Sequence, residues 1–580
     1  MIVRRVAALV TAVVLAPLAL PGYVLRYDMV FVPRQPLSAE MIAPSGALPR
    51  AVPLDAVVSL ANLAVPGWLL QRLALVAVVY LAALGAARLV PSGRRGTRVA
   101  ASLGYAWTPF LAERLLIGQW ALLLAYAMLP WLIIAVRDLT VRRPGALPRL
   151  LIVAAPAALT PTGGLFALAA VGILAPLRSR ATVLALAGVS TLNLPWLVAA
   201  LTGTAGGTSD PDGVAQFAAR AENWGGTLIA LAGTGGIWNA QTVPGSRTSV
   251  LVPVVTLVLL AIAAVGLPEL RRRWPGGAHR LFVLAGGGFL LAAAGATPAA
   301  GMLEWLVGHV PGAGLVRDGQ KFLIPYAMLL ALCLALGAER LAAAPARRFE
   351  PAAGRVLLAS IALLPVVLLP DLAFGVAGAL RPVSYPADWD RVAALVESDP
   401  GEVLSLPFEG YRRSSWTGGV VVRDPAPRYL DAPVLMNDAL RVGTVTVDGE
   451  SPRAAEAAAL LAAGRPAAEL GVRWVLVDRS GPASPPGVFA GLTLVHDGQD
   501  LRLWANPAAV AMPRGPVHLV LAAHLLAGTL VLIACCGYAW YGPRTHESGE
   551  EEWPSWPRSS SRPSPGESSA SSASSPPMAR

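Results

Sequence analysis

Residues 120–136 read WALLLAYAMLPWLIIAV, an almost unbroken apolar run of the kind that crosses a membrane. Four arginines follow it closely: Arg137, Arg142, Arg143 and Arg149. Short Arg-rich loops stay on the cytoplasmic side of a membrane. This stretch therefore predicts a membrane span that ends at the cytoplasm, and it gives the rest of the chain an orientation.

The same arrangement recurs in both directions from this stretch. Arginine clusters occupy every second gap between apolar runs: Arg4 and Arg5; Arg94, Arg95 and Arg98; Arg178 and Arg180; Arg271, Arg272, Arg273 and Arg280; Arg347 and Arg348. The gaps between these clusters hold longer, mixed loops. The alternation predicts a multi-pass plasma-membrane protein with its N- and C-termini in the cytoplasm and its longer loops outside.

Apolar runs predict about twelve transmembrane helices. We expect them near 6–22, 67–89, 98–112, 119–136, 149–160, 164–177, 182–202, 249–268, 281–297, 322–343, 355–373 and 516–541. Residues 160–164 (TPTGG) interrupt the stretch 149–177, which we interpret as two short helices meeting at an outside turn. One kinked helix would invert everything downstream, whereas two helices place Arg178 and Arg180 inside.

Composition agrees with a membrane protein. Hydrophobic residues make up 55% of the chain, charged residues 14%, and the mean hydropathy is +0.57. Ordinary soluble domains are about a quarter charged. The net charge of +11 lies in the predicted cytoplasmic loops, so topology explains it better than nucleic-acid binding does. Cys333, Cys535 and Cys536 all fall in apolar segments, so we expect neither a disulfide framework nor a zinc site.

The spans divide the chain into four parts. We expect a mainly helical transmembrane domain over 1–373, a small extracytoplasmic α/β domain over 374–512, a last transmembrane helix over 513–541 and a disordered cytoplasmic tail over 542–580. The outer loops of the first part are 23–66, 203–248 and 298–321, and 54–63 within the first loop is typical of a surface helix.

Strand patterns support the α/β assignment of 374–512. Residues 403–407 and 472–478 are short apolar strands, 453–463 is an Ala-rich helix, and 492–495 with 501–504 flank a hairpin turn. We find no nucleophile–base arrangement in this domain. It is therefore predicted to be a binding or structural element.

Asp28 follows the first predicted span, in the stretch YVLRYD at 23–28. A carboxylate held at the outer membrane surface suits a general base, which must lie within hydrogen-bond reach of the proton it takes. The alternative is a solvated loop acid paired with Arg26. The sequence leaves both open.

Two further clusters lie at predicted outer turns. Glu113, Arg114 and Gln119 sit close to the hydrocarbon, where charges are costly and mark candidate functional sites. The alternative is a Glu113–Arg114 pair that simply closes the turn.

Arg317, Asp318 and Lys321 precede the span near 322–343, and Lys321 is the only lysine of the chain. Their cations suit a phosphate headgroup. The alternative is snorkelling of the Lys321 side chain to the interface. We predict that Arg114, Arg317 and Lys321 converge on one phosphate at the outer face.

These ordered features resemble the GT-C superfamily of polytopic glycosyltransferases. The points of contact are the acid after the first span, the pattern P-F-x-x-E-R-L-x-x-G-Q-W at 109–120, R-D-G-Q-K-F at 317–322, and G-V-R-W-V-L-V, L-R-L-W-A-N-P and M-P-R at 471–477, 501–507 and 512–514. Within the superfamily the chain is most similar to actinobacterial arabinofuranosyltransferase-like and YfhO-like membrane proteins.

The resemblance implies transfer of a sugar, arabinofuranose or mannose, from a polyprenyl-phosphate donor to a cell-envelope glycan or protein outside the membrane. Asp28 matches the position of the family's catalytic base. Many GT-C enzymes carry a D-x-D or E-x-D pair, whereas Met29 and Val30 follow Asp28, so the resemblance implies no cofactor and leaves divalent-metal dependence open. The second function class is a non-catalytic GT-C-like scaffold, or a transporter or flippase of lipid-linked glycans. The ionisable residues gather at one face of the membrane rather than at the bilayer midplane, and this favours the transferase over a transporter.

Overall fold

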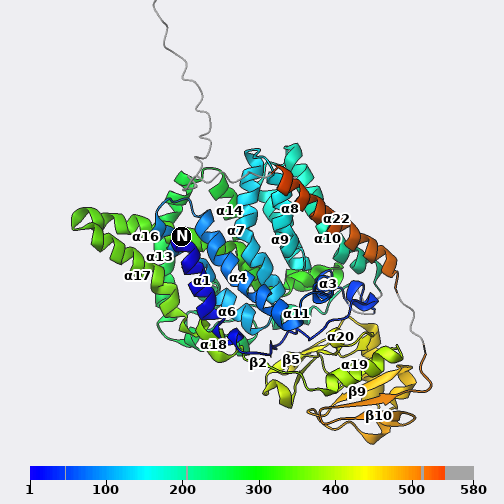
Figure 1. The fold of residues 1–580 in the computed structure, drawn as a ribbon. Coiled ribbons are helices and arrows are strands. Elements are labelled where there is room, and N and C mark those ends of the chain that lie inside the picture. The colour runs from blue at the N-terminus through cyan, green and yellow to red at the C-terminus, as the bar shows by residue number, and fades with distance from the viewer. Residues whose placement is uncertain (46–47, 204–206, 511–514, 542–580) are drawn as a thin grey trace, which may run out of the picture.

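The computed structural model describes residues 1–45, 48–203, 207–510 and 515–541. Most of it is a helical bundle, and a smaller α/β domain lies against one end of that bundle (Figure 1). Helix α1 (Ile2–Val14) runs from the N-terminus toward the end that carries the α/β domain. The predicted disordered tail, 542–580, falls outside the described residues.

Among the described residues, eight helices are long and apolar enough to cross a membrane. They are α4 (Gly67–Leu89), α7 (Trp120–Thr140), α10 (Arg180–Thr202), α13 (Val252–Arg273), α14 (Gly277–Ala294), η5 with α16 (Gly319–Leu323 and Ile324–Arg348), α17 (Pro351–Leu368) and α22 (Val517–Tyr541). The shorter helices α1, α5 (Arg95–Ala106), α8 (Ala146–Ala157) and α9 (Pro161–Leu174) stand where other spans are predicted. The chain is a multi-pass membrane protein, and eight of the twelve predicted spans coincide with helices that are long and apolar enough to cross a membrane.

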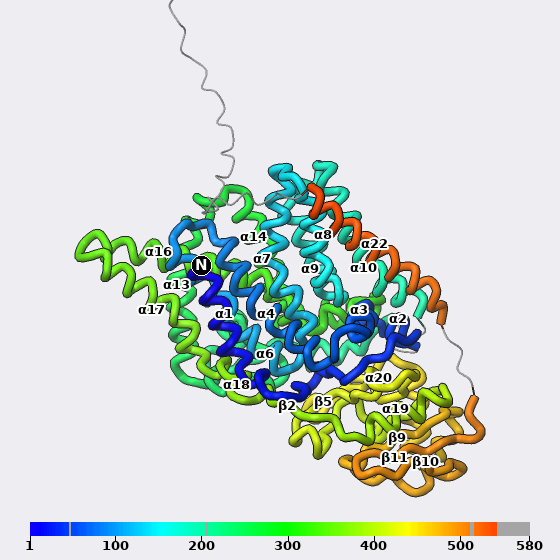
Figure 2. The backbone as a smooth tube through the Cα atoms, viewed as in Figure 1, coloured from blue at the N-terminus to red at the C-terminus, as the bar shows by residue number. Residues whose placement is uncertain are grey.

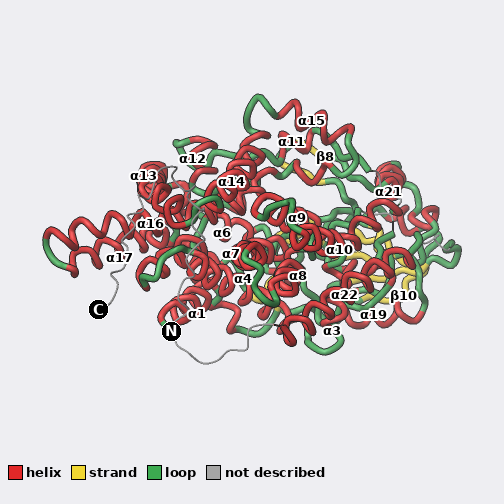
Figure 3. The backbone as a smooth tube through the Cα atoms, turned by 90° about the horizontal axis from the view of Figure 1, so that it is seen from above, coloured by secondary structure: helices red, strands yellow, loops and turns green. Residues whose placement is uncertain are grey.

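Burial separates the centre of the bundle from its rim. The most apolar window of α7 is 89% buried, whereas that of α22 is 17% buried. α22 packs on α8 and α10 at one edge of the bundle (Figure 2). Seen from above, α7 lies among α4, α8 and α9 (Figure 3). The stretch 120–136 therefore forms the helix around which the bundle packs.

The stretch 149–177 forms two helices, α8 and α9, as predicted. Thr160 caps α9, because its Oγ1 accepts a hydrogen bond from the Gly163 amide at 3.1 Å. Pro161 occupies the first helical position, where its missing N–H costs nothing. The Thr-Pro pair thus ends one helix and starts the next.

The α/β domain contains a five-stranded sheet in the order β10-β11-β9-β3-β6. The strands are β3 (Val403–Leu406), β6 (Val434–Leu435), β9 (Trp474–Asp478), β10 (Thr493–Asp497) and β11 (Leu501–Ala505). β3 pairs in parallel with both β6 and β9, and β11 pairs antiparallel with β9 and β10. The two predicted strands and the predicted hairpin are confirmed.

Side chains of these strands alternate between two apolar cores. Val403 and Leu476 pack with Trp389 of α19 (Asp388–Ser398), whereas Leu404 and Val475 pack against α21 (Pro452–Ala462). A two-residue repeat with both faces covered is expected of a sheet between layers. The remaining elements include α2 (Ala39–Ile42), α3 (Leu54–Asn62), α6 (Pro109–Leu116), α11 (Asp212–Gln216), α12 (Gly226–Ala232), α15 (Ala300–His309), α18 (Ala373–Gly378), α20 (Ala426–Tyr429), β4 (Tyr411–Arg413), β5 (Val421–Arg423), β7 (Leu440–Val442) and β8 (Val445–Val447).

The loop 23–66, predicted to lie outside, joins the bundle to the α/β domain. Its strand β1 (Tyr23–Val24) pairs antiparallel with β2 (Pro382–Val383). Farther along, Asp55 of α3 forms an ion pair of 3.1 Å with Arg428 of α20. The loop that carries Asp28 is therefore enclosed between the two parts of the molecule.

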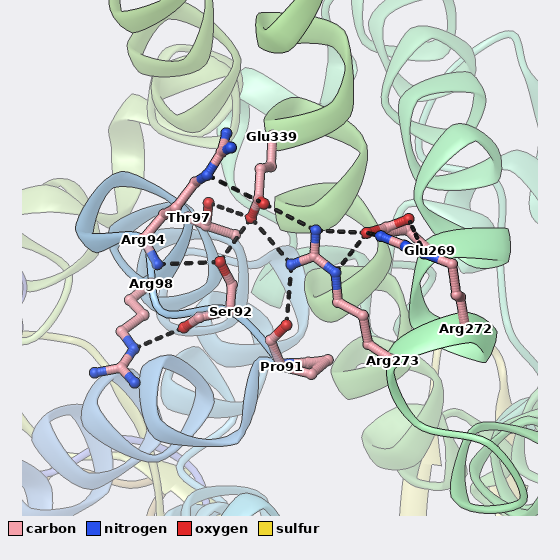
Figure 4. A network of polar contacts seen from close by, with 9 residues as sticks. All are labelled: Pro91, Ser92, Arg94, Thr97, Arg98, Glu269, Arg272, Arg273 and Glu339. Carbon is pink, nitrogen blue, oxygen red and sulfur yellow. Dashed lines mark hydrogen bonds and ion pairs between the residues drawn. The ribbon is translucent and has the colours of Figure 1, made fainter. Parts of the chain in front are cut away.

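The opposite end of the bundle has its own polar cluster. Glu339 lies on α16, about 27 Å farther along the helix axis than Lys321 at 1.5 Å per residue. Its carboxylate accepts from Ser92 and Thr97, both at 2.7 Å, and pairs with Arg273 at 2.9 Å (Figure 4). Glu269 and Arg94 complete this inner network, which ties α13, α16 and the start of α5 together.

Candidate functional site

Asp28 lies in a tight turn at the junction of the two domains. Arg26 and Met29 exchange backbone hydrogen bonds of 3.1 and 2.8 Å across the turn. Tyr27 takes a left-handed conformation with a φ of 44°, and the Asp28 amide donates to the Ile117 carbonyl at 3.2 Å. The turn is thereby attached to the connection between α6 and α7.

Gly118 accounts for the glycine of the 109–120 motif. Its φ is +80°, which favours glycine, and a Cβ at this position would overlap the Arg26 carbonyl oxygen and the Met29 nitrogen. The motif therefore contains glycine because the Asp28 turn packs directly on the backbone there.

The α/β domain holds the other side of the turn. The Tyr27 amide donates to the Val421 carbonyl at 2.7 Å, and the Arg423 amide donates to the Tyr27 carbonyl at 2.9 Å. Tyr27 thus adds one residue to the edge of the β4–β5 ribbon. Asp28 is positioned by both domains at once.

The Asp28 carboxylate contacts one side chain from each domain. The Tyr411 hydroxyl donates to Oδ1 at 2.5 Å, and the Gln119 amide Nε2 lies 3.4 Å from Oδ2. Arg26 instead donates through Nε to the Leu116 carbonyl at 2.8 Å, so the alternative of an Asp28–Arg26 pair is wrong. Burial and the adjacent Asp28 raise the pKa of Tyr411, which keeps the phenol protonated as the donor.

Arg114 is fully buried and binds Asp318 with both terminal nitrogens, at 2.8 and 3.0 Å. The same guanidinium donates to Gln119 Oε1 at 2.5 Å and to Gln320 Oε1. Two-point pairing of this kind fixes orientation as well as charge. The alternative in which Arg114 pairs with Glu113 to close the turn is therefore wrong.

Lys321 extends the chain of polar contacts. Its Nζ lies 3.5 Å from Asp318 Oδ2, its side chain keeps 23% of its surface exposed, and it is close enough to Asp28 to interact electrostatically. Burial alone raises the pKa of Asp318, but the charges of Arg114 and Lys321 outweigh it and lower that pKa. The six residues of this chain are called the outer network below: Tyr411, Asp28, Gln119, Arg114, Asp318 and Lys321.

Arg317 points to a different partner. It forms an ion pair of 3.1 Å with Glu450 of the α/β domain, and its guanidinium lies over the Phe217 ring, 5.1 Å from the centroid. Arg50 of the first loop joins the same carboxylate at 2.5 Å. A single phosphate shared by Arg114, Arg317 and Lys321 would need the two arginines to leave these carboxylates.

Glu113 belongs to a buried branch behind the network. Its Oε2 accepts from Gln320 Nε2 at 2.9 Å, while its other oxygen is close to Glu222. Burial and the Glu222 carboxylate raise the pKa of Glu113. Arg247 pairs with Glu222 at 2.7 Å. The branch is buried behind the turn and does not face the accessible side of the site.

Sequence patterns gave no indication of two residues beside Asp28. Tyr411 and Arg423 are cross-strand partners in the β4–β5 ribbon, nearly four hundred residues from Asp28 in the chain. Burial alone lowers the pKa of Arg423, but Tyr411 and Asp28 raise it above its usual value. Gln320 belongs to the R-D-G-Q-K-F stretch, and its position between Asp318 and Lys321 could have suggested a role.

Within the described ranges, no group of three or more His, Cys, Asp or Glu side chains could hold a metal ion. Asp318, the other carboxylate of the outer network, is occupied by Arg114 and Lys321. The residues around Asp28 therefore supply one carboxylate flanked by cations and hydroxyl or amide donors.

Comparison with solved structures identifies the architecture. The chain superposes on the cryo-EM structure of the arabinofuranosyltransferase AftD from Mycobacteria, a GT-C enzyme, with a TM-score of 0.50 and 18% sequence identity over 88% of this chain. The chain has a GT-C fold. The match covers 41% of AftD, so the chain spans about two fifths of that enzyme's length. No family model and no curated protein matches the sequence.

Proposed function

We propose that this GT-C-fold protein is a membrane glycosyltransferase. It would move a sugar, arabinofuranose or mannose, from a polyprenyl-phosphate donor to a cell-envelope glycan or protein acceptor on the outer face. One observation carries the proposal: Tyr411 and Gln119 fix a half-buried Asp28 carboxylate, within electrostatic range of Lys321, where the helical bundle meets the α/β domain.

The chemistry assigned to Asp28 is general-base catalysis. Its carboxylate takes the proton of an acceptor hydroxyl as that oxygen forms a bond to the anomeric carbon of the donor sugar. The bond from the anomeric carbon to the phosphate oxygen breaks, and the polyprenyl phosphate leaves with the electron pair. Tyr411 and Gln119 orient the carboxylate for this step.

Lys321 is the proposed contact for the donor phosphate. Its side chain is 23% exposed, whereas the Arg114 side chain is fully buried against Asp318. In this proposal Arg114, Asp318 and Glu113 position Lys321 and Gln119, and Arg317 anchors the α/β domain through Glu450. The leaving phosphate gains negative charge as the bond breaks, and a fixed cation stabilises that charge.

The proposal requires the α/β domain to lie outside the cytoplasm, with the N-terminus and the tail inside. The arginine alternation supports this orientation. A single cysteine at Ser484, in a background without the native cysteines, should react with an impermeant thiol reagent in intact cells. Reaction only after permeabilisation would overturn the orientation and the outer-face reaction together.

The activity is tested by profiling envelope glycans and polyprenyl-phosphate sugars in a deletion strain. We expect one lipid-linked sugar to accumulate and the matching glycan residue to fall, with both restored by the wild-type gene. Unchanged amounts of both would contradict the proposal. Lipid-linked glycan trapped on the cytoplasmic leaflet would instead favour the transporter or flippase alternative.

A further inference from the structure

The α/β domain contains a cavity of about 320 Å³ at the carboxyl ends of its two central parallel strands. Pro407 follows the last residue of β3, and Asp478 is the last residue of β9. Ligands of open sheets with parallel strands bind at this edge. The cavity size is at the lower end of the range for small-molecule sites, which suits one sugar residue or two.

The cavity floor is built from fixed polar groups. Arg412 is buried and pairs with Asp424 at 2.8 Å, while also donating to the Pro407 carbonyl at 3.2 Å. Asp478 accepts from the Ser414 hydroxyl at 2.5 Å and from the Ser480 amide at 2.9 Å. These bonds hold the loops around the cavity without the help of a ligand.

The cavity rim combines acceptors, donors and an aromatic face. Glu409 and Arg413 are exposed, and both line the cavity together with Tyr411. Carboxylates accept from sugar hydroxyls and a guanidinium donates to them. The Glu409 and Asp478 carboxylates repel a phosphate or another anion. This combination of acceptors and donors fits a neutral polyhydroxylated ligand.

The β4–β5 ribbon connects the cavity to Asp28. Tyr411 and Arg413 are two residues apart on β4, so they share one face, and their cross-strand partners Arg423 and Val421 share it with them. Val421 and Arg413 border the cavity, whereas Tyr411 contacts both the cavity and the Asp28 carboxylate. One continuous surface thus leads from the cavity to the site of transfer.

We infer that this cavity binds the acceptor glycan, at a sugar residue close to the one whose hydroxyl reaches Asp28. Naming the ligand as the acceptor rests on the proposed function, but binding of an oligosaccharide in the cavity does not require sugar transfer. A chain seated in the cavity would pass Tyr411 and present its end to Asp28. The α/β domain would then set acceptor specificity.

The test uses the full-length protein in nanodiscs and soluble arabinofuranose and mannose oligosaccharides as probes, with binding followed by calorimetry. Wild type should bind one of the two saturably. Ser480→Trp fills the cavity and should weaken oligosaccharide binding about tenfold or more, because the sugar hydroxyls can no longer reach the polar groups at the rim. Ser398→Trp, at the exposed C-terminal end of α19 and outside the cavity lining, is the matched control and should bind like wild type.

Two milder variants keep the test decisive if Ser480→Trp does not fold. Glu409→Gln and Arg413→Gln should each weaken oligosaccharide binding several-fold and raise the acceptor KM without lowering kcat. Glu397→Gln on α19 is their control. Absence of saturable binding by wild type, equal binding by the folded cavity variants, or binding of a peptide in place of the sugars would overturn the inference.

The two proposals fail in different ways. Oligosaccharide binding lost in the cavity variants, without any sugar transfer by wild type, would leave the cavity assignment standing and remove the transferase. Sugar transfer by wild type with an unchanged acceptor KM in the cavity variants would leave the transferase standing and remove the cavity assignment.

Discussion

The two ends of the bundle both concentrate charge, but they use it differently. In the inner network, Glu339 is buried and has partners on both oxygens: Ser92, Thr97 and Arg273. In the outer network, Asp28 and Lys321 stay partly accessible, and Asp28 is held by a tyrosine and a glutamine rather than by a cation. A partly accessible carboxylate can come within hydrogen-bond reach of a substrate hydroxyl, whereas a buried carboxylate saturated by Arg, Ser and Thr only ties helices together.

The outer network itself contains both kinds of group. Arg114 and Asp318 form a buried two-point pair, and Arg273 and Glu339 form a two-point pair in the inner network. Such pairs contribute little net stability, but breaking one is costly. We infer that this rigid pair holds the side chains of Gln119 and Lys321 in position. The contrast between the ends therefore predicts which substitutions affect turnover and which affect folding.

The largest effect is expected at Asp28. Asp28→Asn keeps the shape of the side chain and one acceptor oxygen for the Tyr411 hydroxyl, but it loses the acceptor that faces Gln119 and cannot take a proton, so sugar transfer should fall about 10²–10⁴-fold. Donor binding and the melting temperature should stay at wild-type values. The measurement is transfer by purified protein in nanodiscs, with Asp371→Asn as an acidic-to-amide control away from the network. A fully active Asp28→Asn variant would make Asp28 a structural loop acid.

Glu339→Gln should have the opposite profile. Removing one partner of a buried ion pair typically costs about 3–5 kcal/mol, and Arg273 would lose part of its compensation. We expect a lower apparent melting temperature in a thermal-shift assay, with near-normal turnover per folded molecule. Glu350→Gln, at an exposed site just beyond α16, is the control. A specific loss of kcat without a stability change would show that the inner network also serves the reaction.

Lys321→Ala should reduce donor affinity about tenfold or more, because one charged hydrogen-bond donor to the phosphate is lost. Lys321→Arg keeps the charge and should recover part of that affinity. The affinity is measured with a polyprenyl phosphate added to the detergent-solubilised protein. If Lys321→Ala binds polyprenyl phosphate as tightly as wild type, the cation is anchored at the interface and takes no part in donor binding.

The sequence was most informative where the chemistry is local. Apolar runs predicted the membrane helices and the short strands β3 and β9, and a turn between two short strands predicted the hairpin, because each pattern reflects the surroundings of neighbouring residues. The sequence also indicated four candidate site residues, because charges near the hydrocarbon are costly: Asp28, Arg114, Asp318 and Lys321.

The partners of these residues could not be predicted in the same way. Tyr411 reaches Asp28 only because the first loop is enclosed between the bundle and the α/β domain, a contact between segments 383 residues apart. The pairing of Arg114 with Asp318 rather than Glu113 depends on how α6 meets η5 in space. Periodicity carries no information about such packing, so the sequence alone allowed both wrong alternatives, Asp28 with Arg26 and Glu113 with Arg114.

The smallest expected effect compares two tyrosines of the α/β domain that each donate to an aspartate. Tyr411 donates to Asp28 at 2.5 Å and Tyr429 to Asp390 at 2.7 Å. Either Tyr→Phe change removes one hydrogen bond, with a net cost of about 1 kcal/mol to stability. Only Tyr411→Phe should also slow transfer, by about fivefold, since Tyr411 orients the carboxylate that takes the proton.

The pH dependence sharpens this comparison. Burial comes first among the causes that raise the pKa of both phenols, so both remain protonated in the folded protein through pH 9. A raised pKa in the folded state means that the stabilising bond is fully present below the ordinary tyrosine pKa and is lost only as pH rises toward the folded-state value. The activity gap between wild type and Tyr411→Phe should therefore be constant from pH 7 to about pH 9. A gap that closes within this range, or an equal loss of activity in Tyr429→Phe, would show that Tyr411 supports the domain and not the orientation of Asp28.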